Sequence, residues 1–96
     1  MSAYLIANIR VKDPGKFAEY RDKVAPLIAA HGGRYLIRGG ALTPLEGAAV
    51  FDRVVVLEFP DMAKLRGFYE SAEYAPLIAL RQSASEGEVA LVEGYG

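Results

Sequence analysis

The alternation of apolar and polar residues predicts a β-strand at the start of the chain. Residues 3–11 follow a two-residue period, which places alternate side chains on opposite faces of a strand. One face is wholly apolar and carries Ala3, Leu5, Ala7, Ile9 and Val11. The other face is mixed and carries Tyr4, Ile6, Asn8 and Arg10. We therefore expect helices on the apolar face, and a second subunit or a pocket on the mixed face.

Helical spacing follows at two places, and each begins beside an aspartate and a proline. Asp13-Pro14 opens the first segment, because an Asp side chain caps free backbone amides and Pro is tolerated at the first helical position. Gly32-Gly33 ends this segment, since glycine suits a helix C-cap. Pro60-Asp61 opens the second segment, and Ser71 is expected to cap a further helix over about residues 72–83.

Three more strands complete the pattern, at residues 34–38, 52–59 and 88–93. Residues 52–59 are rich in β-branched side chains and almost continuously apolar, which is typical of a central strand buried on both faces. Residues 41–51 form the connection before it. The order β-α-β-β-α-β predicts an α+β, ferredoxin-like sandwich, in which a four-stranded antiparallel sheet carries its helices on one face.

The length of 96 residues fits one domain, over residues 1–96. Helices on one face leave the other face of the sheet open, and 52% of the residues are hydrophobic. A monomer rarely exposes so large an apolar patch. We therefore expect a symmetric homodimer that pairs through the open sheet face.

Charge and composition exclude several classes of function. Eleven basic residues balance twelve acidic ones, with no run of Lys or Arg, so we expect no nucleic-acid partner and no binding to an anionic membrane. No apolar run approaches a membrane span. The chain has no cysteine and no basic signal-peptide start, and we expect a cytoplasmic protein.

The chain has no standard catalytic or phosphate-binding motif, and only one histidine. We expect no metal site and no cofactor. Histidine is the one residue type whose ordinary side-chain chemistry suits proton transfer near neutral pH, so His31 is a candidate catalytic base at a pocket mouth. Alternatively, it lies at a helix C-terminus, where its cation complements the helix dipole.

A stripe at helical spacing in the late helix is more informative. Its members are Ser71, Tyr74, Ile78, Arg81 and Ser85. Arg81 either extends its charged end to the edge of the protein, or its guanidinium enters the interior and needs an anionic partner. That partner is either Glu58, an isolated carboxylate in an apolar strand, or the carboxylate or phosphate of a ligand. Ser71 and Tyr74 share this stripe and are candidate ligand contacts, and Tyr74 is also a candidate proton carrier.

Three polar residues on strands are further candidate ligand contacts. Arg38 precedes Gly39-Gly40 at a strand end, and Arg53 begins the third strand. Each is either an exposed charge or part of a pocket opening. Asn8 lies in the middle of the first strand, where it completes a buried polar network or contacts a ligand.

Several runs of the chain match one known family in the same order. They are Gly32–Gly40, Leu45–Gly47, Arg53–Pro60, Tyr69–Tyr74 and, downstream, Arg81. In these runs the chain resembles the domain of unknown function 1330 family (DUF1330). The resemblance implies the dimeric α/β-barrel superfamily, and so the ferredoxin-like monomer and the sheet-to-sheet dimer. It implies no activity, because the superfamily includes cofactor-free monooxygenases, haem-degrading enzymes, isomerases and stress-response proteins.

Three functions remain open at this point. The first is a cofactor-independent enzyme that acts on a small anionic or aromatic molecule, with Arg81 or Arg38 holding the anion and Tyr74 or His31 moving a proton. The second is a non-catalytic module that binds a small ligand in the same cavity. The third is a structural, stress-related dimer whose polar residues complete the core. Haem degradation, with His31 as iron ligand, is a weaker variant.

Overall fold

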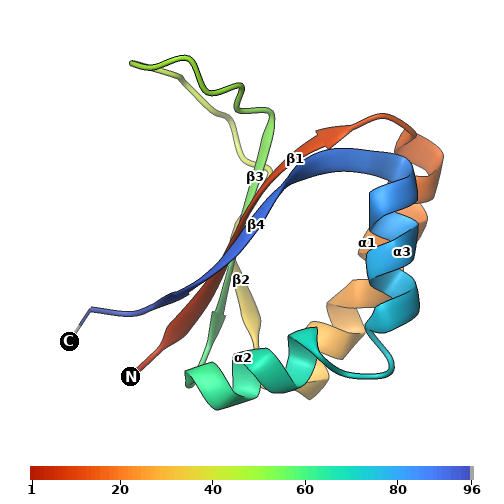
Figure 1. Cartoon of the computed structure of the whole chain (residues 1–96), viewed down its shortest axis with the longest axis vertical. Helices are drawn as coiled ribbons and strands as arrows, with labels where there is room; N and C mark the ends of the chain where they lie inside the picture. The colour runs from red at the N-terminus through yellow and green to blue at the C-terminus, as the bar shows by residue number, and fades with distance from the viewer. Residues whose placement is uncertain (96) are drawn as a thin grey trace.

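The first strand forms the centre of the molecule. In a computed structural model that describes residues 1–95, the order of elements is β-α-β-β-α-α-β (Figure 1). The elements are β1 (Ala3–Val11), α1 (Pro14–Ala30), β2 (Arg34–Arg38), β3 (Arg53–Phe59), α2 (Met62–Tyr69), α3 (Ala75–Ala84) and β4 (Ser85–Glu93). The predicted fold class is confirmed. Within residues 1–95, no helix has both the length and the apolar character needed to cross a membrane.

Aspartate side chains fix the starts of two helices, as their positions predict. The carboxylate of Asp13 accepts a hydrogen bond from the Lys16 amide at 3.1 Å, and that of Asp61 accepts one from the Lys64 amide at 2.8 Å. Such caps satisfy amides that have no partner inside the helix. Both helices therefore begin where the sequence places them.

The late helix and the last strand differ from their predicted bounds. Residues 72–74 form a turn, and α3 begins only at Ala75. Ser71 closes this turn, because its hydroxyl oxygen accepts a hydrogen bond from the Tyr74 amide at 3.2 Å. β4 follows α3 without a loop and begins at Ser85, three residues before the predicted position 88.

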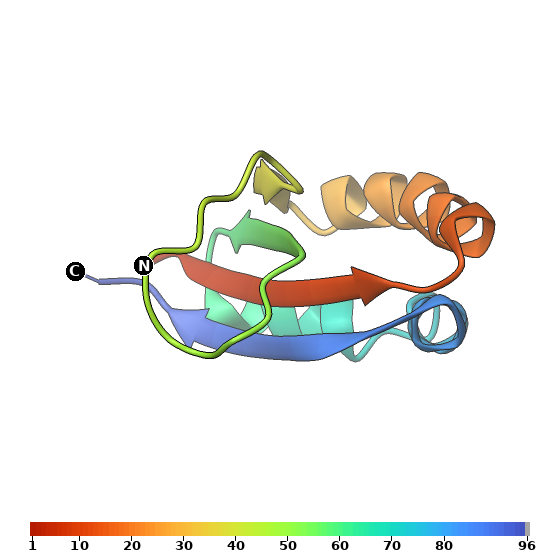
Figure 2. The same ribbon diagram turned by 90° about the horizontal axis from the view of Figure 1, so that it is seen from above.

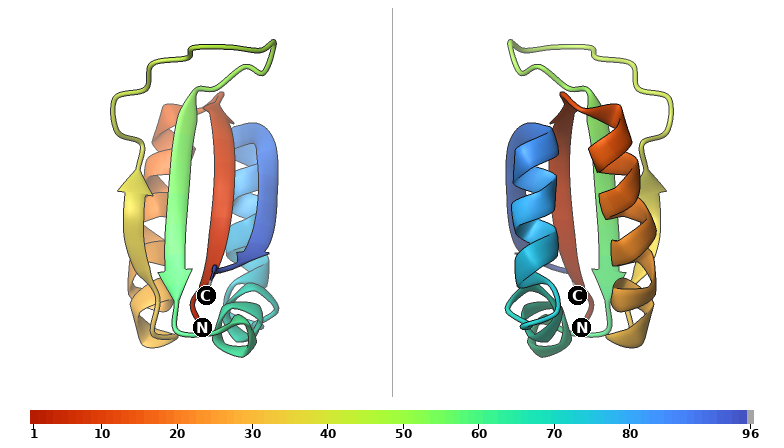
Figure 3. Two further views of the ribbon diagram at one scale, coloured as in Figure 1. Left: turned by 90° about the vertical axis from the view of Figure 1, so that its left-hand side faces the viewer. Right: turned by 90° about the vertical axis from the view of Figure 1, so that its right-hand side faces the viewer.

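The four strands pair in the order β2-β3-β1-β4, and every pair is antiparallel (Figure 3). An irregularity interrupts β2, where Tyr35 pairs with Leu57, Ile37 with Val56 and Arg38 with Val55. The extra residue places Tyr35 and Arg38 on the same face although they are three positions apart. Both side chains consequently lie on the helix side of the sheet.

The helices cover one face of the sheet, and the core lies between them and that face (Figure 3). β1 supplies Ala3, Leu5, Ala7 and Ile9 to this core, as its alternation predicts. β3 is a central strand, as predicted, but Val54 and Val56 on its outer face are only half-buried in the single chain. The prediction that β3 is buried on both faces is therefore not met within one chain, because no helix covers the outer face.

The segment between β2 and β3 extends beyond the end of the sheet and reaches across towards β4 before it returns (Figures 2 and 3). Asn8 anchors its last part. The Asn8 amide nitrogen donates to the Val50 carbonyl at 2.8 Å, and the Asp52 amide donates to the Asn8 side-chain oxygen at 3.1 Å. Asn8 thus satisfies a local network on the open face of the sheet.

Candidate functional site

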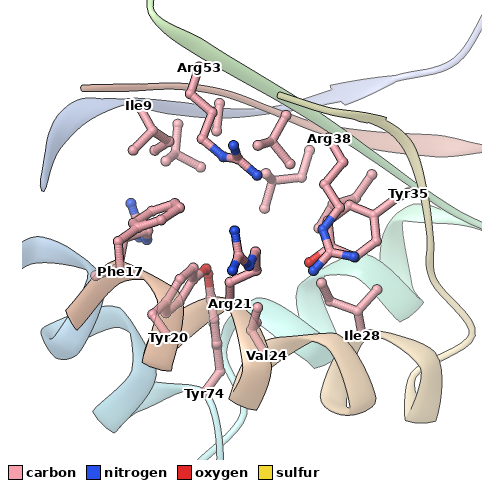
Figure 4. A pocket seen from close by; sticks show the side chains of 16 residues that line it. Ile9, Phe17, Tyr20, Arg21, Val24, Ile28, Tyr35, Arg38, Arg53 and Tyr74 are labelled. Atoms are coloured by element: carbon pink, nitrogen blue, oxygen red, sulfur yellow. The ribbon is translucent and has the colours of Figure 1, made fainter. Parts of the chain in front are cut away.

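A cavity lies between the helices and the covered face of the sheet (Figure 4). Its volume is about 50 Å³, and its walls come from α1, α3 and all four strands. Apolar side chains form most of these walls. They include Leu5, Ala7, Ile9, Phe17, Val24, Ile28, Val55, Leu57 and Val89. The cavity is large enough for a few water molecules, and smaller than the roughly 150 Å³ that accepts benzene.

Four arginines line this apolar cavity, and each comes from a different element. They are Arg21 on α1, Arg38 on β2, Arg53 on β3 and Arg81 on α3. Figure 4 shows the first three directed towards the interior of the cavity from opposite walls. The described lining contains no aspartate and no glutamate. The site is therefore a cationic cavity without an internal counter-ion.

Two of these arginines, Arg53 and Arg81, each have an unsatisfied donor. Only 8% of Arg81 is exposed, and its buried Nε has no hydrogen-bond partner. The buried Nε of Arg53 also has none. Burying a charged donor without a partner is unfavourable. An anion or polar oxygen inside the cavity would remove this cost.

Aromatic rings hold two of the guanidinium groups in place. The Arg38 guanidinium carbon lies 4.6 Å from the centre of the Tyr35 ring, and that of Arg53 lies 5.5 Å from the centre of the Phe17 ring. Such cation–π contacts favour the charge without neutralising it. Gly39 leaves room for Arg53, because a Cβ on Gly39 would collide with Arg53 Nη1. The arginines are thus positioned while their charge stays available.

Two tyrosine hydroxyls meet in the same cavity. The hydroxyls of Tyr20 and Tyr74 are 2.8 Å apart. Burial, together with the neighbouring Tyr74, raises the pKa of Tyr20 far above its ordinary range. Burial also raises the pKa of Tyr74, against the opposing effects of the Tyr20 hydrogen bond and the Arg81 charge. Both side chains are therefore neutral phenols near pH 7, and they donate hydrogen bonds.

The proposed ion pair between Arg81 and Glu58 does not form. Glu58 lies on the opposite face of the sheet, where Arg34 Nη2 is 2.6 Å from its carboxylate and the Tyr4 hydroxyl donates to it at 3.2 Å. The hydrogen bond from Arg34 lowers the pKa of Glu58. The reason is the alternation of β3, since Leu57 faces the helices and its neighbour must face away. Glu58 is therefore not the partner of Arg81 within this chain.

The other predicted site residues also separate into those that line the cavity and those that lie outside it. Arg38, Arg53, Tyr74 and Arg81 meet in the cavity, whereas Asn8 and Glu58 lie on the open face. Ser71 lies outside the cavity, and its hydroxyl donates to the Phe68 carbonyl at 2.8 Å. His31 also lies outside, at the C-cap of α1, where its Nδ1 is 3.0 Å from the Leu27 carbonyl oxygen.

Three site residues were missing from the sequence prediction: Arg21, Tyr20 and Tyr35. For Arg21 a signal existed. Phe17, Arg21, Val24 and Ile28 recur at spacings of four, three and four, so Arg21 lies within the apolar stripe of the helix. A charged residue within such a stripe indicates a buried role. Tyr35 gave no comparable signal, because its direction depends on the irregular pairing of β2.

Comparison with known proteins assigns a family. The family described as "Domain of unknown function (DUF1330)" matches residues 2–95. The chain belongs to the DUF1330 family. No protein with a curated description matches it.

Solved structures share the fold of this DUF1330 chain. The RPA0582 protein of unknown function from Rhodopseudomonas palustris superposes with a TM-score of 0.79 at 18% identity, over 99% of this chain and 83% of that one. SnoaB, a cofactor-independent oxygenase from Streptomyces nogalater, superposes with a TM-score of 0.67 at 16% identity, over 99% and 94%. A conserved protein from Methanosarcina mazei Go1 gives 0.60 at 19% identity, over 99% and 94%. At these identities the likeness is one of fold.

The raised pKa of the tyrosine pair predicts a loss of stability in alkali. Unfolded tyrosine titrates near pH 10, while Tyr20 and Tyr74 keep their protons in the folded chain. The contribution of this pair to the free energy of unfolding is therefore complete below about pH 10. It falls as the pH rises further, because the unfolded chain releases these protons first. We expect Tyr20→Phe to show a shallower fall than the parent.

The measurement is the free energy of unfolding in urea at several pH values between about 8 and 11. Tyr95→Phe is the control, because Tyr95 is fully exposed and should leave the slope unchanged. A Tyr20→Phe slope equal to that of the parent would show that the pair ionises as freely in the folded chain as in the unfolded one.

Proposed function

We propose that this protein binds a small organic anion in the cavity between the helices and the sheet. One observation carries the proposal: the buried Nε atoms of Arg53 and Arg81 have no hydrogen-bond partner within the chain. Guanidinium groups bind carboxylates and phosphates through paired hydrogen bonds. A carboxylate with a very short apolar part would fit a cavity of about 50 Å³ and would match both the arginines and the apolar walls.

The same observation argues against a purely structural role. A core completed by polar residues would pair its buried charges, since unpaired polar groups destabilise the folded state. Here Glu58, the strand carboxylate considered as the partner of Arg81, is bound by Arg34 on the other side of the sheet. The cavity arginines therefore make better sense as ligand contacts than as supports of the core.

The stability of Arg81→Met distinguishes a binding arginine from a structural one. Methionine keeps the apolar length of the side chain and removes the unpartnered charge. Without ligand, we expect the free energy of unfolding to stay unchanged or to rise by up to about 2 kcal/mol. A loss of about 3 kcal/mol or more would indicate a broken buried ion pair and would contradict the proposal.

The same variant tests binding directly. Small carboxylates at about 100 times their Kd should stabilise the parent protein by about 2.7 kcal/mol, which raises the Tm by roughly 4–8 °C per kcal/mol. Arg81→Met should lose this shift. The matched control is Arg34→Met, which removes an arginine from the opposite side of the sheet and should keep it. Equal shifts in both variants would place binding elsewhere.

A catalytic use of this cavity is the second candidate. SnoaB, which shares the fold, is a cofactor-independent oxygenase. In this chain Tyr74, hydrogen-bonded to Tyr20 and close to the Arg81 charge, is positioned to donate a proton to a ligand oxygen. However, the described lining offers no carboxylate and no imidazole to accept one. The geometry therefore favours binding over proton transfer.

Proton exchange separates these two uses. NMR in D2O measures the rate at which the α-hydrogens of a small carboxylic acid are replaced by deuterium. We expect this rate to be the same in the presence of the protein as in buffer alone. Exchange that is faster with the parent and lost in Tyr74→Phe would instead identify an enzyme with Tyr74 as its catalytic group. His31→Asn serves as the control, because His31 lies outside the cavity lining.

We also propose that two copies pair through the open face of the sheet. Ile6 and Ile37 are 42% and 45% exposed there. Both are cross-strand partners of Val56, so the three form a continuous apolar stripe across β2, β3 and β1. A second copy of the same face would cover this stripe symmetrically.

A charge in this stripe should separate the copies. Ile6→Glu places two carboxylates in the symmetric contact, where burying unpaired charges is unfavourable. We expect light scattering after gel filtration to give a dimer for the parent and a monomer for Ile6→Glu. Ala79→Glu, on the exposed side of α3, should remain dimeric. A parent monomer, or a dimeric Ile6→Glu, would contradict this contact.

A further inference from the structure

The segment between β2 and β3 exposes many apolar side chains. Residues 40–52, which we call the arm, are all exposed in the single chain. Leu45 is 88% exposed, Val50 66% and Phe51 47%. Surface loops are normally polar, because exposed apolar side chains gain nothing from contact with water. Large apolar side chains gathered on one exposed segment indicate a surface that another molecule covers.

Hydrogen bonds hold the arm at both of its ends. Where the arm begins, the Gly39 amide donates to the Val54 carbonyl at 2.9 Å. Gly47, at a φ of +89°, lets the chain turn back. Where the arm ends, the Asn8 side chain donates to the Val50 carbonyl at 2.8 Å. The arm is thus attached to the sheet on both sides, while its middle extends away from it (Figure 1).

The arm projects on the side of the sheet that the helices leave open. Figure 1 shows it leaving the end of the sheet in the direction opposite to the helices. Asn8, which holds Val50, lies on the open face of β1, and Ile6 of the apolar stripe is the next residue of β1 on that face. The apolar surface therefore continues from the stripe onto the arm. A molecule that covers the open face also meets the arm.

The open face alone offers little apolar contact. Ion pairs lie near both of its ends, between Arg10 and Glu88 and between Arg34 and Glu58. The apolar stripe is confined to the region between these pairs. Stable interfaces bury about 1,200–2,000 Å² in total, and a stripe of a few side chains provides less than this. The arms of two copies would supply further apolar area to the same contact.

We propose that the arm of each copy packs its apolar side chains on the second copy. This inference rests on the proposed pairing and specifies the segment that completes it. The arm suits a protein surface better than a membrane, because its only charged residues are Glu46 and Asp52, and anionic lipids repel carboxylates. The arm thereby extends the interface beyond the sheet.

A single tryptophan in the arm tests this contact. The chain has no tryptophan, so Leu45→Trp introduces one indole at a position that is exposed within the single chain. In the dimer, we expect its fluorescence to shift to shorter wavelength and to become less accessible to acrylamide. In Ile6→Glu/Leu45→Trp, which should be monomeric, the indole should be exposed. Ala79→Trp, on the exposed side of α3, should remain exposed in the dimer.

A polar substitution in the arm measures what the contact contributes. Leu45→Ser should raise the Kd of the dimer roughly tenfold or more, because both copies lose a buried leucine. Sedimentation over a range of protein concentrations gives this Kd. In the monomeric Ile6→Glu background, Leu45→Ser should leave the midpoint of urea unfolding unchanged, since the leucine is exposed within one chain.

The outcomes separate this inference from the pairing beneath it. A dimer in which the indole of Leu45→Trp stays exposed, or an unchanged Kd in Leu45→Ser, overturns the arm contact and leaves the pairing in place. A parent that is monomeric at every concentration overturns both. A shift that also occurs in Ile6→Glu/Leu45→Trp places the arm on its own chain, and one that occurs only with phosphatidylcholine vesicles places it on a membrane. Either result overturns the inference.

Discussion

The alternation of side chains along β1 and β3 is the constraint on which the rest of the structure depends. Because successive residues face opposite sides of a sheet, each strand divides its chemistry between two separate environments. Leu57 faces the helices and Glu58 faces away, so the carboxylate that could have neutralised Arg81 is held by Arg34 instead. The cavity is cationic because the carboxylate in this strand lies on the wrong face to enter it.

An apolar cavity that holds four guanidinium groups must tolerate mutual repulsion. Three features reduce the cost. Two of the groups lie over aromatic rings, the charges come from four different elements, and the tyrosine hydroxyls between them stay neutral and add no further charge. None of these features removes the charge. A protein that keeps the buried Arg81 and the buried Nε of Arg53 without a partner for these atoms retains an arrangement that stability alone does not favour, which is typical of a binding site.

The sequence predicted the parts of the fold that depend on local chemistry. The capping aspartates, the apolar face of β1 and the central place of β3 all follow from single residues or a simple period. The candidate site was predicted only in part, because it depends on register. Arg38 and Tyr35 share a face only through the irregular pairing of β2. Whether Glu58 could pair with Arg81 depended on which face of β3 it occupies. The alternation along β3 settles that face only once the buried face of the strand is known.

The two faces of the sheet then have complementary roles. The covered face holds the cavity, where the buried Nε atoms of Arg53 and Arg81 lack partners and so reduce the stability of a chain that is small and has a limited core. The open face carries an apolar stripe that is half exposed in the single chain. Burial of that stripe against a second copy would stabilise the fold without contacting the cavity, since the sheet lies between them. Pairing on one face would thereby offset the destabilisation caused by the positive charge on the other face. A bound anion would neutralise that charge directly.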